Sequence, residues 1–358
     1  MTTSAADGVW GYTAELAREL DRLGHQVVLA SLGGTLSDAQ RGEIGDLERV
    51  TLHESDYPLD ADDDETLASA AEWLEALQRA TRCDIVHCND YGPLQREWSV
   101  PTLLVAHGCR YAKWRVAHPK DAGTQWQRYR ERVAAALRNA RHVVAPTNAV
   151  LRELEESYAD AGLHARASVI YKGVDSVRWT VGQERERLFV LGVGPLADEG
   201  KNLQCLAAAA ETLPCPVLIA AAGRPERGRA PRAILLKRLP RSRLAVYYRR
   251  ARVLAHPARY EPFGLTVLEA ALSGCALVLG DIATLRELWG PAAVFVEPTD
   301  REALHDAIVT LLRRPDELAE FGRRARRHAL RYSARAMALS YVRRYESLLT
   351  PSSSAAAQ

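Results

Sequence analysis

Two glutamates that lie eight positions apart, Glu261 and Glu269, are the residues best placed to do chemistry. Between them the chain reads E-P-F-G-L-T-V-L-E, in which Gly264 marks a turn and a helix begins at Leu265. Backbone N–H groups at a helix start have no intrahelical acceptor, and the helix dipole favours negative charge there. The turn therefore predicts a diphosphate site, and both carboxylates are suited to accept hydrogen bonds from ribose or hexose hydroxyls. Surface helices also supply glutamates at this spacing, so the spacing alone leaves a solvated helix face open.

Short apolar strands and helices alternate along the whole chain, which predicts parallel sheets covered by helices on both faces. The pattern restarts near residue 167, and this restart indicates two successive α/β units joined near 172–179. The expected strands are 26–30, 84–87, 102–106, 142–145, 167–171, 188–193, 216–222, 253–256, 276–279 and 294–296. The expected helices include 14–23, 126–139 and 265–272.

The length of 358 residues suits two domains of roughly 150 to 200 residues each. We expect an N-terminal domain over 1–172, a C-terminal domain over 173–335, a C-terminal helix 336–349 that joins the N-terminal domain, and a disordered tail over 350–358. A Rossmann-like domain begins with a central strand before its first helix. Residues 1–10 are polar and small up to Val9, so we expect this first strand to be missing.

Composition excludes several classes of protein. The net charge of +2 argues against a nucleic-acid binder. No stretch approaches the ~18 apolar residues of a membrane span, and six cysteines without Cys-x-x-Cys spacing predict reduced thiols rather than a disulfide framework or a zinc site. We therefore expect a cytoplasmic protein. Arginine and lysine clusters at 110–115, 128–132 and 323–327 are typical of solvated helices, and they leave open a peripheral contact with the inner membrane face.

The full string from Glu261 to Glu269 closely resembles the E-x7-E signature of glycosyltransferase family 4, whose members are retaining enzymes of the GT-B fold. The resemblance covers nearly the whole chain, because matching segments occur in both halves. These segments are G-V-W at 8–10, V-A-H-G around His107, V-A-P-T at 144–147, Y-K-G-V-D at 171–175, G-P-L-A-D-E-G-K-N at 194–202 and G-D-I-A-T-L-R-E-L-W-G at 280–290. The resemblance implies two Rossmann-like domains with the site in an interdomain cleft.

The resemblance also implies roles for single residues. Glu269 would bind the ribose hydroxyls of the nucleotide, and Glu261 the hydroxyls of the donor sugar. Lys201 would neutralise charge on the diphosphate leaving group, and His107 would contact the transferred sugar from the N-terminal domain. The remaining donor-site residues would be Gly194, Phe263, Gly264, Leu265 and Thr266. The acceptor side would include Gly8 and Trp10.

The implied reaction moves a sugar from a nucleoside diphosphate sugar to a glycan, a lipid-linked acceptor or a small molecule, with retention of configuration. In the mechanism assumed for the family, the acceptor attacks from the face that the diphosphate leaves, and a phosphate oxygen takes its proton. The protein then works by positioning and electrostatic stabilisation, so no cofactor and no metal are expected. Two alternatives stay open: a relative that epimerises or phosphorolyses sugars, and a non-catalytic nucleotide-sugar binder of the same fold.

The sequence departs from the family pattern in three places: the phosphate loop, the linker, and the N-terminal loop, where the first strand and the second glycine are expected to be missing. Pro195 stands where the phosphate loop usually has an arginine, and this removes a cation contact of about 1.5–3 kcal/mol. Arg224 is a conceivable substitute, although a solvated loop arginine is the commoner interpretation. Lys172 replaces the usual asparagine of the linker, and the D-x-D at 62–64 fits a helix cap better than a metal motif.

Overall fold

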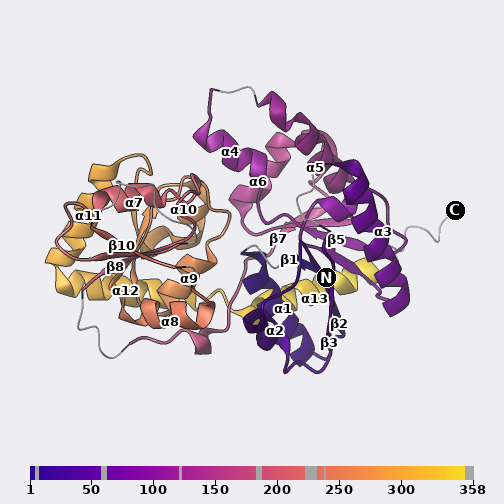
Figure 1. Cartoon of the computed structure of the whole chain (residues 1–358), viewed down its shortest axis with the longest axis horizontal. Helices are drawn as coiled ribbons and strands as arrows, with labels where there is room; N and C mark the ends of the chain where they lie inside the picture. Colours follow the sequence, from indigo (N-terminus) through magenta and orange to yellow (C-terminus); the bar gives the residue numbers. More distant parts are fainter. Residues whose placement is uncertain are drawn as a thin grey trace. The chain divides into compact units, whose positions relative to one another are not determined.

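The structure is a computed structural model that describes residues 1–4, 8–57, 63–120, 123–182, 188–221, 232–237 and 239–350. The chain divides into two compact units, whose elements are labelled in Figure 1. Unit 1 comprises Met1–Ala112, Ala122–Gly173 and Ala334–Gln358. Unit 2 comprises Lys113–Asp121 and Val174–Ser333.

Two parallel sheets form the centre of unit 1. One has the strand order β1-β2-β3 and the other β4-β5-β6-β7. The strands are β1 (Thr2–Ser4), β2 (Val27–Leu32), β3 (Val50–Glu54), β4 (Val86–Cys88), β5 (Thr102–Val105), β6 (His142–Ala145) and β7 (Ala167–Val169). Every pair is parallel, and all residues of β5 and β6 are buried, as expected for strands covered on both faces.

Helices cover these sheets. They are α1 (Val9–Arg22), α2 (Asp38–Ile44), α3 (Asp64–Thr81), α5 (Gln127–Asn139), α6 (Asn148–Ser157) and α13 (Ala334–Leu349), with short 3-10 turns η1 (Gly92–Leu94), η2 (Thr124–Trp126) and η3 (Ala159–Ala161). The helix α4 (Arg110–Ala117) begins in unit 1 and continues in the segment assigned to unit 2. The last helix, α13, packs against α1, so the end of the chain completes unit 1 (Figure 1).

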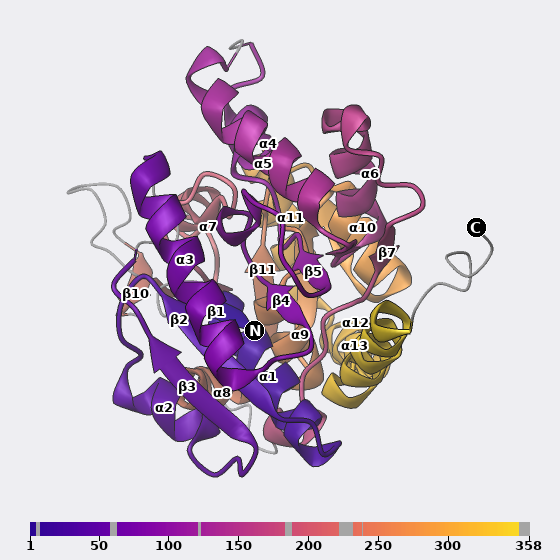
Figure 2. The same cartoon turned by 90° about the vertical axis from the view of Figure 1, so that its right-hand side faces the viewer.

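The first strand, which the sequence led us to expect missing, is present as β1. It pairs with β2, with Thr2 opposite Ala30, and lies between β2 and β4 (Figure 2). Its hydroxyl groups find partners inside the unit: Thr2 Oγ1 accepts from the Asn89 N–H at 2.8 Å, and Thr3 Oγ1 donates to Thr13 Oγ1 at 3.2 Å. The prediction was wrong because a buried strand whose polar groups are hydrogen-bonded does not need apolar side chains.

Unit 2 contains one parallel sheet with the strand order β10-β9-β8-β11-β12-β13. The strands are β8 (Val190–Val193), β9 (Val217–Ala220), β10 (Ala233–Leu236), β11 (Val253–His256), β12 (Ala276–Gly280) and β13 (Val294–Val296). The helices are α7 (Leu203–Ala209), α8 (Arg241–Arg250), α9 (Leu265–Leu272), α10 (Ala283–Trp289), α11 (Arg301–Arg313) and α12 (Pro315–Ala329), with 3-10 turns η4 (Ser176–Arg178) and η5 (Gly290–Ala292). Two hydrophobic clusters, one around Tyr248 and Trp289 and one around Leu203 and Leu304, build its core.

Among the residues that the structure describes, no helix combines the length and the hydropathy that a membrane-spanning segment requires.

Candidate active site

The loops that follow β8 and β11 lie side by side at the carboxyl end of the unit 2 sheet. These two strands are neighbours, and the strand order runs outward from them in opposite directions. Open α/β sheets bind ligands at such a switch point, outside the carboxyl ends of the strands. Two backbone hydrogen bonds join the loops, from the N–H groups of Arg259 and Tyr260 to the carbonyl of Gly200, at 2.8 and 3.1 Å.

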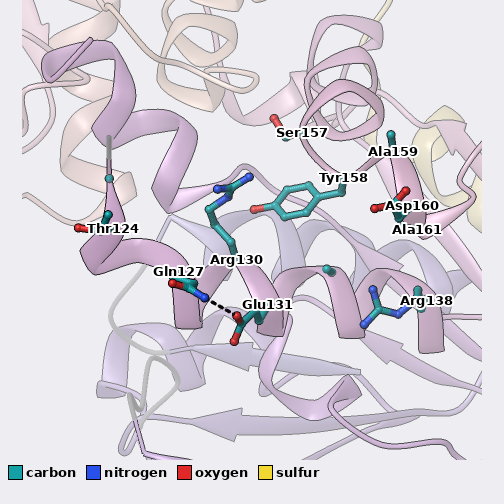
Figure 3. Close-up of a pocket in the computed structure, with 12 residues that line it drawn as sticks. Thr124, Gln127, Arg130, Glu131, Arg138, Ser157, Tyr158, Ala159, Asp160 and Ala161 are labelled. Atoms are coloured by element: carbon teal, nitrogen blue, oxygen red, sulfur yellow. Dashed lines mark hydrogen bonds between the residues drawn. The ribbon is translucent and has the colours of Figure 1, made fainter. Parts of the chain in front are cut away.

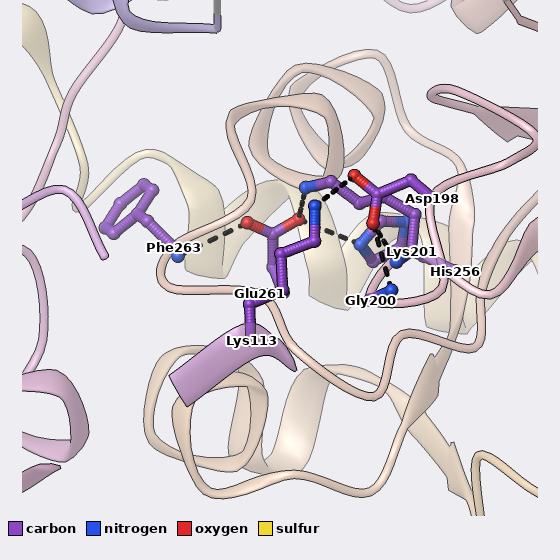
Figure 4. A network of polar contacts seen from close by, with 7 residues as sticks. All are labelled: Lys113, Asp198, Gly200, Lys201, His256, Glu261 and Phe263. Carbon is purple, nitrogen blue, oxygen red and sulfur yellow. Dashed lines mark hydrogen bonds and ion pairs between the residues drawn. The ribbon is translucent and has the colours of Figure 1, made fainter. Parts of the chain in front are cut away.

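A buried carboxylate, Glu261, is the centre of this region (Figure 4). Its Oε2 atom lies 2.5 Å from Lys201 Nζ and 2.9 Å from His256 Nε2, and the Phe263 N–H donates to Oε1 at 3.4 Å. Lys201 and Glu261, predicted from motifs 60 residues apart, therefore meet. His256 was not among the predicted site residues, although its place at the end of an apolar strand was a usable signal.

The electrostatics of Glu261 favour the ionised form. Burial raises the pKa of its carboxyl, but the Lys201 charge and the hydrogen bond from His256 outweigh burial and lower that pKa well below its usual range. Glu261 is therefore a carboxylate at neutral pH. An ionised, buried carboxylate can accept further hydrogen bonds from hydroxyl groups.

Asp198 orders the loop that carries Lys201. Its Oδ1 accepts from the N–H groups of Gly200 and Lys201 at 2.9 and 3.1 Å, an arrangement that tightens the turn. Its Oδ2 lies 2.7 Å from Lys113 Nζ (Figure 4). Lys113 was assigned to a solvated basic cluster from sequence, and only the structure brings it to this loop.

Two residues with left-handed backbone bound the same loop. Gly194 has φ 144° and follows β8, and Asn202 has φ 55° and precedes α7. The Asn202 side chain donates to the carbonyls of Pro257 and Pro298 at 2.9 and 2.7 Å, so it ties the loop to the segments after β11 and β13. Pro195, at the family's arginine position, is exposed.

The start of α9 supplies N–H groups beside Glu261. Gly264 caps this helix with φ 85°, and a Cβ there would lie 3.3 Å from Glu261 Cγ, so both conformation and space favour glycine. Leu265 and Thr266 occupy the first turn, whose N–H groups have no acceptor within the helix. The Phe263 ring is buried against Tyr332, so its contribution to a ligand would come from its backbone.

Glu269 has a separate cation, Arg241. Its Oε1 accepts from Arg241 Nε at 3.1 Å and from Nη2 at 2.7 Å, and the carboxylate is 4% exposed. The Arg241 guanidinium lies 5.5 Å from the centre of the Trp179 ring, within cation–π range. The two glutamates of the motif are thus held by different positive groups. Arg241 was not predicted from the sequence, where its only signal was its place directly after Pro240 at a helix start.

The three predicted site residues of unit 1, His107, Trp10 and Gly8, differ in burial and in hydrogen bonding. His107 follows β5, with Nε2 2.9 Å from Asn89 Oδ1 and its ring edge-on to Tyr12 at 4.7 Å. Trp10 is buried, and its indole N–H donates to Glu43 at 2.9 Å. Gly8 precedes α1, and no described residue would contact a Cβ at this position.

Other candidates from the sequence have local explanations. Asp63 caps α3 by accepting from the Thr66 N–H at 2.7 Å, as predicted, and Asp64 pairs with Arg128 and Arg132. Among the described residues no group of His, Cys, Asp and Glu side chains could hold a metal ion. Asp62, Arg224 and residues 351–358 lie outside the part that the structure describes.

A separate hollow of about 450 Å³ lies in unit 1 beside α5 and η3 (Figure 3). Its lining mixes charges of both signs, with Arg130 and Arg138 near Glu131 and Asp160. None of the residues predicted to bind donor or acceptor lines it.

Solved structures show which fold the chain has. A sucrose-phosphate synthase from Thermosynechococcus elongatus matches with a TM-score of 0.78 and 21% identity, over 95% of this chain and 93% of that one. HepE from Anabaena, solved in complex with UDP-glucose, matches with a TM-score of 0.74 and 16% identity, over 97% and 98%. Two Rossmann-like units of this kind form the GT-B fold of glycosyltransferases.

Sequence comparisons identify the family. The profile of Glycosyltransferase Family 4 matches residues 6–178, and that of Glycosyl transferases group 1 matches residues 226–328. Glycosyltransferase family 4 is thus the family that the N-terminal half of the chain matches, and the C-terminal half matches a second glycosyltransferase model.

Curated relatives support this assignment at moderate identity. A D-inositol 3-phosphate glycosyltransferase of Gordonia bronchialis is 27% identical, over 96% of this chain and 86% of the relative. The enzyme of the same name from Corynebacterium urealyticum is 28% identical, over 59% of this chain and 58% of the relative. A glycogen synthase of Mycobacterium tuberculosis is 28% identical, over 69% and 64%. The match thus spans less than two thirds of the length of two of these relatives.

Proposed function

We propose that the chain transfers a sugar from a nucleoside diphosphate sugar to a hydroxyl acceptor, and that unit 2 binds the donor. One observation carries the proposal: Lys201 and Glu261 meet beside the start of α9. This arrangement offers a cation and helix N–H groups to a diphosphate, and a carboxylate to sugar hydroxyls. The UDP-glucose complex of HepE, a protein of the same fold, supports the choice of donor class.

Lys201 has two roles in this proposal. Without donor, its ammonium group balances the buried charge of Glu261. An ammonium group has three N–H donors, so with donor bound it can keep one bond to Glu261 and direct another to a phosphate oxygen. It would then stabilise the negative charge that develops as the diphosphate leaves.

Glu269 would hold the ribose in the same proposal. Its carboxylate is already fixed in place by Arg241, and a fixed acceptor loses less conformational entropy when a ligand binds. Phe263, Gly264, Leu265 and Thr266 would contribute backbone groups at the start of α9, and Gly194 would let the backbone approach the phosphates.

We further propose transfer with retention, without a metal ion. The curated relatives carry names of enzymes that act on D-inositol 3-phosphate or build glycogen, and these names support an acceptor rich in hydroxyl groups. A cytoplasmic location with a peripheral membrane contact remains part of the proposal. A non-catalytic nucleotide-sugar binder is the second candidate, because the exposed Pro195 supplies no charge to the diphosphate.

The test is a screen of nucleotide sugars for consumption by the full chain, with and without hydroxyl acceptors and after EDTA treatment. We expect one donor to be consumed, an α-linked product from an α-linked donor by NMR, and EDTA-resistant turnover. Lys201→Ala should lower turnover by about 10²–10³, whereas Lys120→Ala, which changes an exposed lysine, should not. Binding of a donor without consumption would favour the non-catalytic candidate, and neither binding nor consumption would reject the proposal.

A further inference from the structure

Asn89, which follows β4, links both histidines at the centre of unit 1 to the first strand. Its side chain is buried at 7% exposure. Its Nδ2 donates to the Thr2 carbonyl at 2.7 Å. On the other side, its Oδ1 lies 2.9 Å from His107 Nε2 and 3.2 Å from His87 Nε2.

The Thr2 carbonyl fixes which way this amide points. A carbonyl oxygen only accepts hydrogen bonds, so the Asn89 NH₂ group must face Thr2. The reversed amide would place two oxygens 2.7 Å apart, and no donor would lie between them. Asn89 Oδ1 therefore faces the two imidazoles.

The amide orientation then decides where the histidine protons are. Asn89 Oδ1 is an acceptor with two lone pairs, so both facing Nε2 atoms must be donors. His87 Nδ1 becomes the acceptor for the Tyr345 hydroxyl, which lies 2.6 Å away on α13. Each bond in the chain Tyr345–His87–Asn89–His107 thus has one donor and one acceptor.

The surroundings of His107 keep it neutral. Burial, the Lys172 charge and His87 lower the pKa of its imidazole well below the ordinary value. Tyr12 from α1 packs against the ring, and Lys172 lies 5.5 Å from the centre of the Tyr12 ring. A neutral His107 with a proton on Nε2 carries a lone pair on Nδ1, and Nδ1 is buried with no partner among the described residues.

We propose that Asn89 is a positioning residue that holds His107 in the Nε2–H tautomer, so that Nδ1 accepts a hydrogen bond from a hydroxyl of a sugar substrate. The last clause rests on the proposed glycosyltransferase function, while the tautomer does not. The ligand class follows from the chemistry: a lone pair accepts from a hydroxyl and repels a phosphate oxygen. The missing partner of Nδ1 is then supplied by the substrate.

The first experiment is NMR of the full chain with ¹⁵N-labelled histidine, in which His107→Gln assigns the His107 signals. We expect His107 to show a neutral ring protonated at Nε2 from about pH 5 to about pH 8. A ring protonated at Nδ1, or one that titrates in this range, would overturn the proposal. This measurement needs no variant of Asn89.

The second experiment uses Asn89→Asp, which puts a carboxylate against the same two imidazoles. The variant also loses the bond to the Thr2 carbonyl, so its NMR spectrum first shows whether the fold is retained. The negative charge should raise the pKa of His107, so that the ring titrates in the NMR experiment. Turnover should fall about tenfold at neutral pH and recover as pH rises and His107 loses its added proton. A purely structural defect would not recover with pH.

Asn148→Asp is the matched control, because it makes the same chemical change at an exposed position at the start of α6. It should leave the His107 signals and the pH profile unchanged. A titrating His107 in Asn89→Asp with unaltered turnover would refute the substrate contact while the tautomer stands. A wild-type chain that shows the Nε2–H tautomer but no turnover with any donor would instead count against the proposed function.

Discussion

The two units bury histidines in opposite electrostatic settings. In unit 2, His256 shares Glu261 with Lys201, and the cluster is charged. In unit 1, His87 and His107 share the neutral amide of Asn89. A buried charge needs an opposite charge, whereas a neutral network needs only one donor and one acceptor in every bond. Under the proposed function, the charged cluster of unit 2 suits phosphate groups and the neutral network of unit 1 suits hydroxyl groups.

The largest effect should come from breaking the charged cluster at Lys201. Lys201→Met leaves the Glu261 carboxylate buried without its cation, so we expect a loss of about 3 kcal/mol in the free energy of unfolding. We also expect a fall of about 10²–10³ in kcat. Chemical denaturation and steady-state kinetics measure the two quantities.

Adding Glu261→Gln to Lys201→Met sharpens this test. The double variant has no buried charge at this place, so it should regain stability without regaining activity. Equal stabilities of the single and double variants would show that Lys201 does not compensate Glu261.

Glu269 should matter for binding rather than for the chemical step. Glu269→Ala removes the proposed ribose acceptor and leaves Arg241 without this carboxylate, so the free nucleoside diphosphate and the intact donor should both bind about tenfold to a hundredfold more weakly. Calorimetry measures both affinities. Unchanged affinity for the free nucleotide would remove the ribose assignment.

Acid should weaken unit 1 before unit 2. Burial lowers the pKa of His87 to about 3, so the unfolded chain, with an ordinary histidine pKa of about 6.5, binds the proton more tightly. The contribution of His87 to the stability of unit 1 is complete above that unfolded pKa and is lost as pH falls. The loss reaches about 3 kcal/mol by about pH 4.

Glu261 also has a lowered pKa, but its unfolded pKa is only about 4.3. Its contribution to the stability of unit 2 is complete above that value and begins to fall only below it. Hydrogen exchange of peptides from each unit, followed against pH, should show the earlier loss in unit 1. His87→Gln should make the protection of unit 1 less dependent on pH. If both units lost protection at the same pH, the predicted difference between them would be wrong.

Sequence patterns predicted most of the strands and missed β1, β3 and β10. The strands β6, β11 and β13 have the predicted bounds, because β6 and β11 are apolar runs buried throughout and β13 is a short apolar run. The strands β3 and β10, which lie at sheet edges and are partly exposed, were not predicted. The polar β1 was expected to be missing, because a search for apolar periodicity does not detect a strand whose buried side chains are hydrogen-bonded hydroxyls.

The residues of the candidate site also fall into those that the sequence predicted and those that only the structure revealed. Glu261, Glu269 and Lys201 were named from a motif resemblance, and the structure shows the contact between Lys201 and Glu261. Asn89 and Arg241 could not be named, because their importance depends on partners that the fold brings together over long sequence distances.

The smallest expected effect comes from restoring an arginine at Pro195. This residue is exposed at the end of β8, and its carbonyl accepts the Asp198 N–H at 3.2 Å, a turn that Pro195→Arg leaves available. A guanidinium there would add charge near the proposed diphosphate, so kcat should rise about tenfold with little change in acceptor KM.

Pro214→Arg is the matched control, because it adds the same charge to an exposed loop at the amino end of β9, opposite the site. A rise in both variants would indicate a general charge effect. A fall in kcat for Pro195→Arg alone, with the fold intact, would mean that another cation already fills this place.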